Sequence, residues 1–283
     1  MPELPEVETV RRGLAPAMEG REFAKVEQRR ADLRFPLPTN FSSRLLGATL
    51  QAIGRRGKYL VAQLSTDETL IMHLGMSGRF TINGADTTSY VHDHDGLSRH
   101  DHIIFTMSGR DAPTIIYNDP RRFGFMDLVA SAEIDHCRHF AGMGPEPLGN
   151  QFNDTDFAER LKNRKTPVKS ALLDQKIVAG IGNIYACEAL YRAQISPRRG
   201  AASVAGKRSA RLRRALVDVL NEAIAAGGST LKDFSNTDGD LGYFQHRFRV
   251  YDREGDECTI CGKAIERITQ AGRSTFFCSS CQR

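Results

Sequence analysis

Four cysteines lie in the last 26 residues of this 283-residue chain, and they limit what its C-terminus can fold into. They form two Cys-x2-Cys pairs, with sixteen residues between the pairs: Cys258, Cys261, Cys278 and Cys281. Each pair can present two thiolates from one turn, and two such turns complete the tetrahedral shell of one zinc ion. A tail this short buries little core without a metal. The spacing therefore predicts a zinc finger over residues 245–283 with one structural Zn²⁺; two disulfides or incidental thiols are the alternatives.

The remaining composition is that of an ordinary globular chain of about two domains. Apolar residues make up 40% and charged residues 26%, so each domain can bury a core. No apolar run approaches the roughly 18 residues of a membrane helix, and the acidic N-terminus lacks the apolar stretch of a secretory signal. We therefore expect a cytoplasmic protein with no membrane contact. In that compartment Cys137 and Cys187, which have no partner spacing, are expected to be ordinary thiols.

The basic charge is concentrated in the middle of the chain. Residues 151–227 carry 14 Lys and Arg against 7 Asp and Glu, whereas residues 1–150 carry 17 against 19 and residues 228–283 carry 8 against 8. The net charge of +5 thus comes from one segment. Such a segment attracts a polyanion such as nucleic acid. The alternative is a solvated basic helix face.

Hydrophobic periodicity changes along the chain and indicates an α+β fold. A helix is expected over residues 5–15, ended by Gly13 and Pro16. Short β-rich runs then follow at residues 59–64, 69–74, 102–107, 114–117 and 124–129. Runs of this kind between turn residues are typical of a sandwich or barrel, so we predict an N-terminal β-sandwich domain over residues 1–135. The polar stretch 81–101 is expected to be a mobile loop.

Helical periodicity dominates from residue 150 to 235, where we predict a helical domain that its basic charge makes a candidate for DNA binding. Residues 172–179 fit one helix, the Gly-Ile-Gly-Asn stretch 180–183 breaks it, and residues 184–192 fit a second. Two helices joined by a tight Gly turn resemble a helix-turn-helix, although an ordinary helical hairpin has the same pattern. Asn183 stands where an N-cap would lie, beside amides that can hold a phosphate. Residues 212–223 mark a longer amphipathic helix that ends at Gly227.

Pro2 is a candidate catalytic group. Removal of Met1 is favoured by a small second residue and would leave Pro2 as a secondary amine in a rigid ring. An α-amino group titrates near pH 8, so part of it is an unprotonated nucleophile at neutral pH and can form a Schiff base. Glu3 is adjacent and can act as an acid or a base. Many proteins begin with Met-Pro, so Pro2 alone is weak evidence for catalysis and further motifs are needed.

Further motifs along the chain support a catalytic role for Pro2. The chain opens Met-Pro-Glu-Leu-Pro-Glu and continues with Arg-Arg-Gly-Lys-Tyr-Leu at 55–60, His-Leu-Gly-Met-Ser-Gly at 73–78, Asp-Pro-Arg-Arg-Phe-Gly at 119–124, Gly-Ile-Gly-Asn-Ile-Tyr-Ala at 180–186 and Gly-Gly-Ser-Thr-Leu at 227–231. With the four-cysteine tail, this ordered set closely resembles the bacterial formamidopyrimidine-DNA glycosylases, which are 8-oxoguanine DNA glycosylases and AP (apurinic or apyrimidinic site) lyases. The resemblance runs from residue 2 to residue 282. It implies a β-sandwich with one helix, then a helix-two-turn-helix domain with the zinc finger.

The resemblance also implies the reaction, which is base excision repair of 8-oxoguanine and formamidopyrimidines in duplex DNA. Pro2 would attack C1′ and expel the base, Glu3 would do acid–base work on the sugar, and β- and δ-elimination would follow. Lys58 matches the proton donor for β-elimination and Arg273 that for δ-elimination. Because an Arg does not deprotonate readily, we expect both residues mainly to clamp the phosphates beside the lesion. Glu6 either orients the sugar or the amine, or is an ordinary helix-end charge.

The resemblance to the family also implies which residues of this chain contact DNA. Met76, Arg121 and Phe123 would fill the gap left by the flipped base, with Arg121 bonded to the base opposite, preferably cytosine. The other expected contacts are His73, His100, Arg164, Asn183 and Tyr251. The loop 228–231 would close over the flipped base and read it through its amides. We expect a monomer that associates with the bacterial nucleoid through DNA.

Two features depart from the family pattern, and two rival functions share part of it. Asp252 follows Tyr251 where Gly is expected, and the His-rich stretch 92–95 suggests either a metal site or a solvated loop.

The first rival function is that of the endonuclease VIII branch, which prefers oxidised pyrimidines and usually opens Pro-Glu-Gly-Pro-Glu. The second is a zinc-ribbon DNA-binding protein without catalysis, and the presence of the candidate catalytic residues Pro2, Glu3, Lys58 and Arg273 argues against it.

Overall fold

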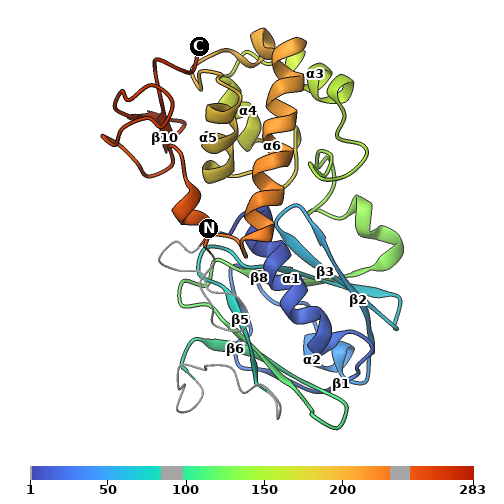
Figure 1. Ribbon diagram of the computed structural model, residues 1–283. Coiled ribbons are helices and arrows are strands. Elements are labelled where there is room, and N and C mark those ends of the chain that lie inside the picture. Colours follow the sequence, from blue (N-terminus) through green and yellow to red (C-terminus); the bar gives the residue numbers. More distant parts are fainter. Residues whose placement is uncertain (1, 84–97, 230–242) are drawn as a thin grey trace. The chain divides into compact units, whose positions relative to one another are not determined.

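The computed structural model describes residues 2–83, 98–229 and 243–283 (Figure 1). The expectations for the His-rich stretch 92–95 and for Thr230 and Leu231 lie outside these residues. The chain divides into two compact units. The first contains residues 2–141 together with the segment that begins at Gly227, and the second contains residues 142–226 and 244–283. Residues 227–229, which fall within the range expected for the helical domain, thus group with the N-terminal unit.

The N-terminal unit is a sandwich of two antiparallel four-stranded sheets (Figure 1). One sheet has the spatial order β2 (Leu50–Arg56), β3 (Tyr59–Leu64), β4 (Glu68–His73), β8 (Phe125–Ala130). The other has the order β1 (Phe23–Gln28), β6 (Asp101–Met107), β7 (Thr114–Asn118), β5 (Arg79–Asn83). Apolar side chains of both sheets meet in one buried core, which includes Leu60 and Met72 from the first and Phe105 and Tyr117 from the second. The predicted β-sandwich is confirmed.

Helix α1 (Leu4–Met18) joins this core and is longer than the sequence suggested. The expected end at Gly13 and Pro16 is wrong, because the helix continues through both residues. Its buried face explains the extra turn: Val10, Leu14 and Met18 continue the helical spacing into the sandwich core. A short helix α2 (Phe41–Leu45) and a 3₁₀ turn η1 (Ser131–His136) complete the unit.

The strands that the sequence revealed are those with continuous apolar runs. Strands β3, β4, β6, β7 and β8 lie at the five expected positions within one residue at either end. Strands β1 and β2 were missed because most of their side chains are polar or exposed. The expected loop 81–101 was wrong at its start, because residues 81–83 complete β5 by pairing with β7.

The second unit is helical. It contains α3 (Asp154–Lys162), α4 (Val168–Leu173), α5 (Asn183–Arg192), η2 (Ala201–Val204), α6 (Lys207–Ala225) and η3 (Phe244–Arg247). The helix expected over residues 172–179 instead lies at 168–173. Beyond it the side chain of Gln175 bonds to the backbone of Leu173, Gly180 and Ile181, which folds residues 174–182 into turns. The N-cap of α5 is Gly182, so Asn183 is its first residue and not its cap.

The C-terminal residues form an antiparallel hairpin of β9 (Glu266–Gln270) and β10 (Arg273–Phe277). Its two-residue turn, Ala271-Gly272, has positive φ at both positions, as a type I′ turn requires. The hairpin packs with Tyr191 of α5 in a small core of its own. No helix within the described residues is long and apolar enough to cross a membrane.

Candidate functional site

The N-terminal segment is buried where it enters helix α1. Pro2 is buried, and Glu3, which is only 3% exposed, is the N-cap of the helix. Glu6 accepts the backbone N–H of Glu3 through Oε2 at 2.9 Å, which satisfies an amide at the helix start. Its other oxygen, Oε1, accepts both the N–H and the hydroxyl of Ser229, at 2.8 and 2.9 Å. Glu6 is therefore more than a helix-end charge, because its two carboxylate oxygens join Ser229 to the N-terminal end of helix α1.

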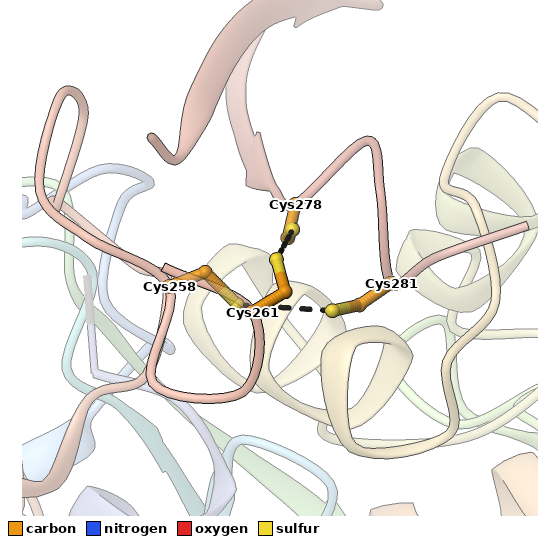
Figure 2. A group of neighbouring side chains, drawn as sticks. All are labelled: Cys258, Cys261, Cys278 and Cys281. Carbon is orange, nitrogen blue, oxygen red and sulfur yellow. Dashed lines mark hydrogen bonds between the residues drawn. The ribbon is translucent and has the colours of Figure 1, made fainter. Parts of the chain in front are cut away.

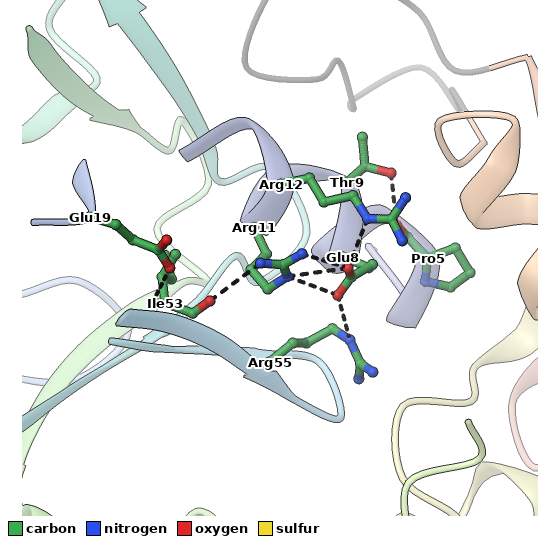
Figure 3. Close-up of polar contacts among 8 residues, drawn as sticks. All are labelled: Pro5, Glu8, Thr9, Arg11, Arg12, Glu19, Ile53 and Arg55. Carbon is green, nitrogen blue, oxygen red and sulfur yellow. Dashed lines mark hydrogen bonds and ion pairs between the residues drawn. The ribbon is translucent and has the colours of Figure 1, made fainter. Parts of the chain in front are cut away.

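Lys58 lies in the two-residue turn between β2 and β3 and is buried. A charged cluster fixes helix α1 to the same hairpin (Figure 3). The carboxylate of Glu8 contacts Arg11 at 3.0 Å, Arg12 at 2.9 Å and Arg55 of β2 at 3.4 Å. Burial raises the pKa of Glu8, but the three guanidinium groups outweigh it and hold the pKa below its ordinary value. This cluster sets the position of the helix that carries Pro2 and Glu3 against the hairpin that carries Lys58.

His73 ends strand β4 and packs among aromatic rings. Its ring stacks on Phe125 with centroids 5.2 Å apart and lies 4.9 Å from the ring of Tyr59. Its Nδ1 accepts the N–H of Gly75 at 3.0 Å. Burial and the neighbouring cation of Lys58 lower the pKa of His73 to about 4. His73 is therefore neutral at physiological pH, and its Nε2 carries the proton that it can donate.

Four other expected DNA contacts come from turns at one end of the sandwich. Met76 follows β4, His100 precedes β6, and Arg121 and Phe123 follow β7. The pairing of the strands brings these turns together, because the start of β5 and the start of β6 both pair with the end of β7 at Asn118. Phe123 is 43% exposed, and the guanidinium of Arg121 lies 5.0 Å above its ring. An exposed aromatic beside a cation suits insertion into stacked bases.

In the second unit, the side chains of Asn183 and Lys169 bind the backbone of the residue that follows Arg273. The amide of Asn183 donates to the carbonyl of Ser274 at 2.9 Å, and Ser274 follows Arg273 at the exposed tip of the hairpin. Lys169 is fully buried and donates to the same carbonyl at 3.0 Å and to the hydroxyl of Thr275 at 2.7 Å. Two helices thus hold the strand on which Arg273 is presented.

Tyr251 is held by a buried carboxylate. Glu188 of α5 is fully buried and accepts the N–H groups of Arg249, Val250 and Tyr251 at 2.9–3.1 Å. The next residue, Asp252, is exposed and has φ +59°, a left-handed conformation that explains why Gly is expected there and why Asp is tolerated.

Arg164 stands apart from these groups. Its side chain is exposed and has a long ion pair, 3.8 Å, with Asp174. Its guanidinium is therefore a solvent-exposed cation, and its role as a phosphate contact stays a prediction.

The four cysteine sulfurs converge from two turns of the tail (Figure 2). All lie within 4.8 Å of one another, with Cys258–Cys281 at 3.9 Å and Cys261–Cys278 at 3.5 Å. Four sulfurs about 2.3 Å from one tetrahedral zinc ion would be about 3.8 Å apart. The donor set therefore fits one closed, structural zinc site. Burial raises the pKa of Cys258, but the Tyr191 hydroxyl and the amides of Ile260 and Cys261 outweigh it and lower the pKa to about 6. Burial and the neighbouring thiols raise the pKa of Cys281 to about 12, so a bound zinc ion would have to displace that proton to gain its fourth thiolate.

Two buried charged residues that hold neighbouring backbone were missed at the level of sequence: Lys169 and Glu188. Glu188 lies on the buried stripe of α5 with Ile184 and Tyr191, so a charge on an apolar face was a usable signal. Lys169 likewise stands between apolar helix residues.

Comparisons with known proteins agree with this architecture. Three family models match in order: the formamidopyrimidine-DNA glycosylase N-terminal domain over residues 1–126, the H2TH domain of the same enzymes over residues 143–235, and the zinc finger found in FPG and IleRS over residues 255–283. Together they define a DNA glycosylase built from three consecutive parts.

Relatives match along the full chain. The formamidopyrimidine-DNA glycosylase of Ruegeria pomeroyi is 55% identical over 285 residues, covering all of both chains. Among solved structures, the MutM (FPG) protein of Thermus thermophilus is 40% identical with a TM-score of 0.86, covering 99% of this chain and 98% of that one. A mutant FPG of Lactococcus lactis bound to DNA containing Fapy-dG is 34% identical with a TM-score of 0.87, covering all of both chains. The chain belongs to the formamidopyrimidine-DNA glycosylase family.

Proposed function

We propose that Pro2 is the nucleophile with which this enzyme removes oxidised purines, among them 8-oxoguanine and formamidopyrimidines, from duplex DNA. Family membership makes the chain a DNA glycosylase of base excision repair, and AP lyase activity is typical of the family. The observation that carries the residue-level proposal is the buried Pro2-Glu3 segment at the positive end of helix α1, fastened by Glu6. That end of the helix favours the unprotonated amine that the reaction requires.

The reaction begins at the amine of Pro2. The nitrogen of Pro2 bonds to C1′ as the C1′–N bond to the base breaks, and the base leaves with a proton. Opening of the sugar ring breaks C1′–O4′ and gives an iminium, with Glu3 supplying the proton to O4′. The iminium acidifies C2′, whose proton is lost as the C3′–O bond breaks. Loss of the C4′ proton, which the conjugated iminium acidifies, then breaks the C5′–O bond and expels the 5′ phosphate, and hydrolysis of the iminium frees the enzyme.

Lys58 and Arg273 bind the two phosphates that flank the lesion in this proposal. Stabilising a departing phosphate requires a basic side chain that binds its oxygens more than a group that transfers a proton. Arg273 is suited to this by its place at the exposed tip of a hairpin whose backbone is held by Asn183 and Lys169. The structural Zn²⁺ at the four cysteines would hold that hairpin closed.

The DNA contacts divide by chemistry. Met76 and Phe123 replace the flipped base in the stack, and Arg121 bonds to the base opposite, preferably cytosine. His73 donates to a phosphate as a neutral imidazole, and Asn183, His100, Arg164 and Tyr251 contact the backbone. The enzyme acts as a monomer in the bacterial cytoplasm, on the DNA of the nucleoid.

A substrate panel tests the proposal. Duplexes with one 8-oxoguanine opposite cytosine, one oxidised pyrimidine, or no lesion are incubated with protein whose N-terminus is shown to be Pro2. The expected result is preferential excision of 8-oxoguanine with a one-nucleotide gap, and accumulation of the β-elimination product by Arg273→Ala. Preference for the oxidised pyrimidine, or binding of the lesion without strand cleavage, would overturn it.

A further inference from the structure

Two turns of the N-terminal unit meet backbone to backbone. The turn 75–78 carries Met76, and the turn 121–124 carries Arg121 and Phe123. A Cβ added to Gly75 would lie 2.3 Å from the carbonyl carbon of Phe123 and from the nitrogen of Gly124. The two turns therefore touch with no side chain between them, and whatever fixes one of them fixes the other.

Asp119 is the group that joins them. Its side chain is completely buried, so its carboxylate must find its donors within the protein. Oδ1 accepts the hydroxyl of Ser77, from the first turn, at 2.6 Å. Oδ2 accepts the N–H of Gly124, from the second turn, at 2.8 Å, and the hydroxyl of Tyr117 at 3.3 Å.

Ser77 completes the link. Its Oγ accepts the N–H of Arg121 at 3.2 Å while its proton goes to Asp119. Hydrogen bonds therefore lead from the N–H of Arg121 in the second turn to the hydroxyl of Ser77 in the first turn, and from that hydroxyl to the carboxylate of Asp119. The same carboxylate also binds the second turn at Gly124. The backbone of Asp119 extends the same network, since its N–H donates to the carbonyl of His100 and its carbonyl receives Nε2 of His102 at 2.9 Å.

We propose that Asp119 and Ser77 are positioning residues that hold Met76, Arg121 and Phe123 in one fixed arrangement, and that this arrangement sets how strictly the enzyme reads the base opposite the lesion. The inference rests on the proposed DNA contacts of those three side chains. Arg121 can discriminate cytosine only if its backbone is fixed relative to the side chains that fill the gap, and a displacement of about 1 Å commonly costs up to about 100-fold in rate.

Ser77→Ala is the main variant, because it removes the link and leaves the buried carboxylate its other donors. Thr69→Val is the matched control: Thr69 is also buried in this unit, and its hydroxyl bonds only to Ser131 Oγ, at 2.8 Å, in the contacts described for it. Ser77→Thr restores a hydroxyl, and Asp119→Asn keeps the shape but loses the charge. The fraction of active molecules is counted by borohydride trapping, and all rates are divided by it.

Two readouts follow in single-turnover experiments. The first is the ratio of 8-oxoguanine excision opposite cytosine to that opposite adenine. We expect Ser77→Ala to lower this ratio at least about fivefold and Asp119→Asn to lower it less, with Ser77→Thr and Thr69→Val near wild type. The second is the fluorescence of 2-aminopurine beside the lesion, which reports insertion of Met76 and Phe123 and should lose amplitude in Ser77→Ala.

The outcomes separate the inference from the function on which it rests. A ratio and an amplitude for Ser77→Ala equal to those of Thr69→Val would overturn the positioning role. If Arg121→Ala keeps the wild-type ratio, the proposed reading of the opposite base fails instead, and the fluorescence amplitude alone decides whether Ser77 positions the inserted side chains. Should Ser77→Ala not fold, Asp119→Asn is compared with Thr69→Val in its place, and a ratio and an amplitude for Asp119→Asn equal to those of Thr69→Val would overturn the positioning role.

Discussion

Replacing Glu8 by Gln removes the charge at the centre of the cluster that joins helix α1 to the β2–β3 hairpin. The Glu8 side chain is 13% exposed, Arg55 is 10% exposed and Arg11 is 26% exposed, so the cluster lies between a surface pair and a buried one. Breaking an exposed pair costs about 0.5 kcal/mol and breaking a buried pair about 4 kcal/mol. We therefore expect Glu8→Gln to lower the free energy of unfolding by about 2 kcal/mol, which corresponds to a fall in Tm of about 4–8 °C.

Thermal unfolding followed by circular dichroism measures this loss, because the chain contains no Trp for fluorescence. Glu27→Gln is the matched control: it removes one charge from the same unit, but Glu27 is 35% exposed and pairs with Arg29 on the surface. Its expected loss is at most about 0.5 kcal/mol. Equal losses in the two variants would refute the account of the cluster as a partly buried clamp.

The pH dependence gives the cluster a second test. The folded-state pKa of Glu8 lies below its ordinary value. Its contribution to stability is therefore complete above the ordinary pKa and is lost as the pH falls through the lowered one. The difference in Tm between wild type and Glu8→Gln should be full at pH 7 and shrink only in acid. A Tm difference that grew as the pH fell would contradict the predicted direction of the pH dependence.

Three further predictions concern other parts of the chain. Tyr191→Phe removes a hydroxyl that lies 3.2 Å from Cys258 Sγ, so zinc transfer to a chromogenic chelator should be about tenfold faster, and an unchanged rate would exclude this support. His73→Gln should weaken DNA binding by the same factor at pH 6 and pH 8, since the pKa of His73, lowered to about 4 by burial and by Lys58, keeps it neutral; a larger factor at pH 6 would show a charged contact. Gly75→Ala should cost at least about 2 kcal/mol more in unfolding free energy than Gly20→Ala, because both have positive φ but nothing lies within 4 Å of a Cβ at Gly20; equal costs would show that the turns can separate.

Local patterns predicted those features whose physical cause is local. The Cys-x2-Cys pairs lie in two short turns, and their sulfurs meet as the spacing requires. Apolar runs gave β3, β4, β6, β7 and β8. Strands β4, β6 and β7 are buried on both faces, which leaves a continuous apolar signature, whereas buried and less buried positions alternate along β3. The end of α1 was misjudged because the gain from burying Met18 outweighs the local penalties of Gly13 and Pro16.

The remaining site residues depend on contacts between distant parts of the sequence. Asp119 contacts Ser77, 42 residues away, and Glu6 contacts Ser229, 223 residues away. No periodicity or spacing encodes such a contact, because it arises only after the strands have paired. The roles of Pro2, Lys58 and Arg273 likewise came from the resemblance to a family and stay predictions.

The central claim is that Pro2 forms the covalent intermediate, and borohydride trapping tests it most directly. Protein shown to begin at Pro2 is mixed with a duplex containing one 8-oxoguanine opposite cytosine, reduced, digested and mapped by mass spectrometry. The account predicts a crosslink on the N-terminal peptide at the nitrogen of Pro2. A crosslink on a lysine such as Lys58, or no crosslink from protein that binds the duplex, would contradict it.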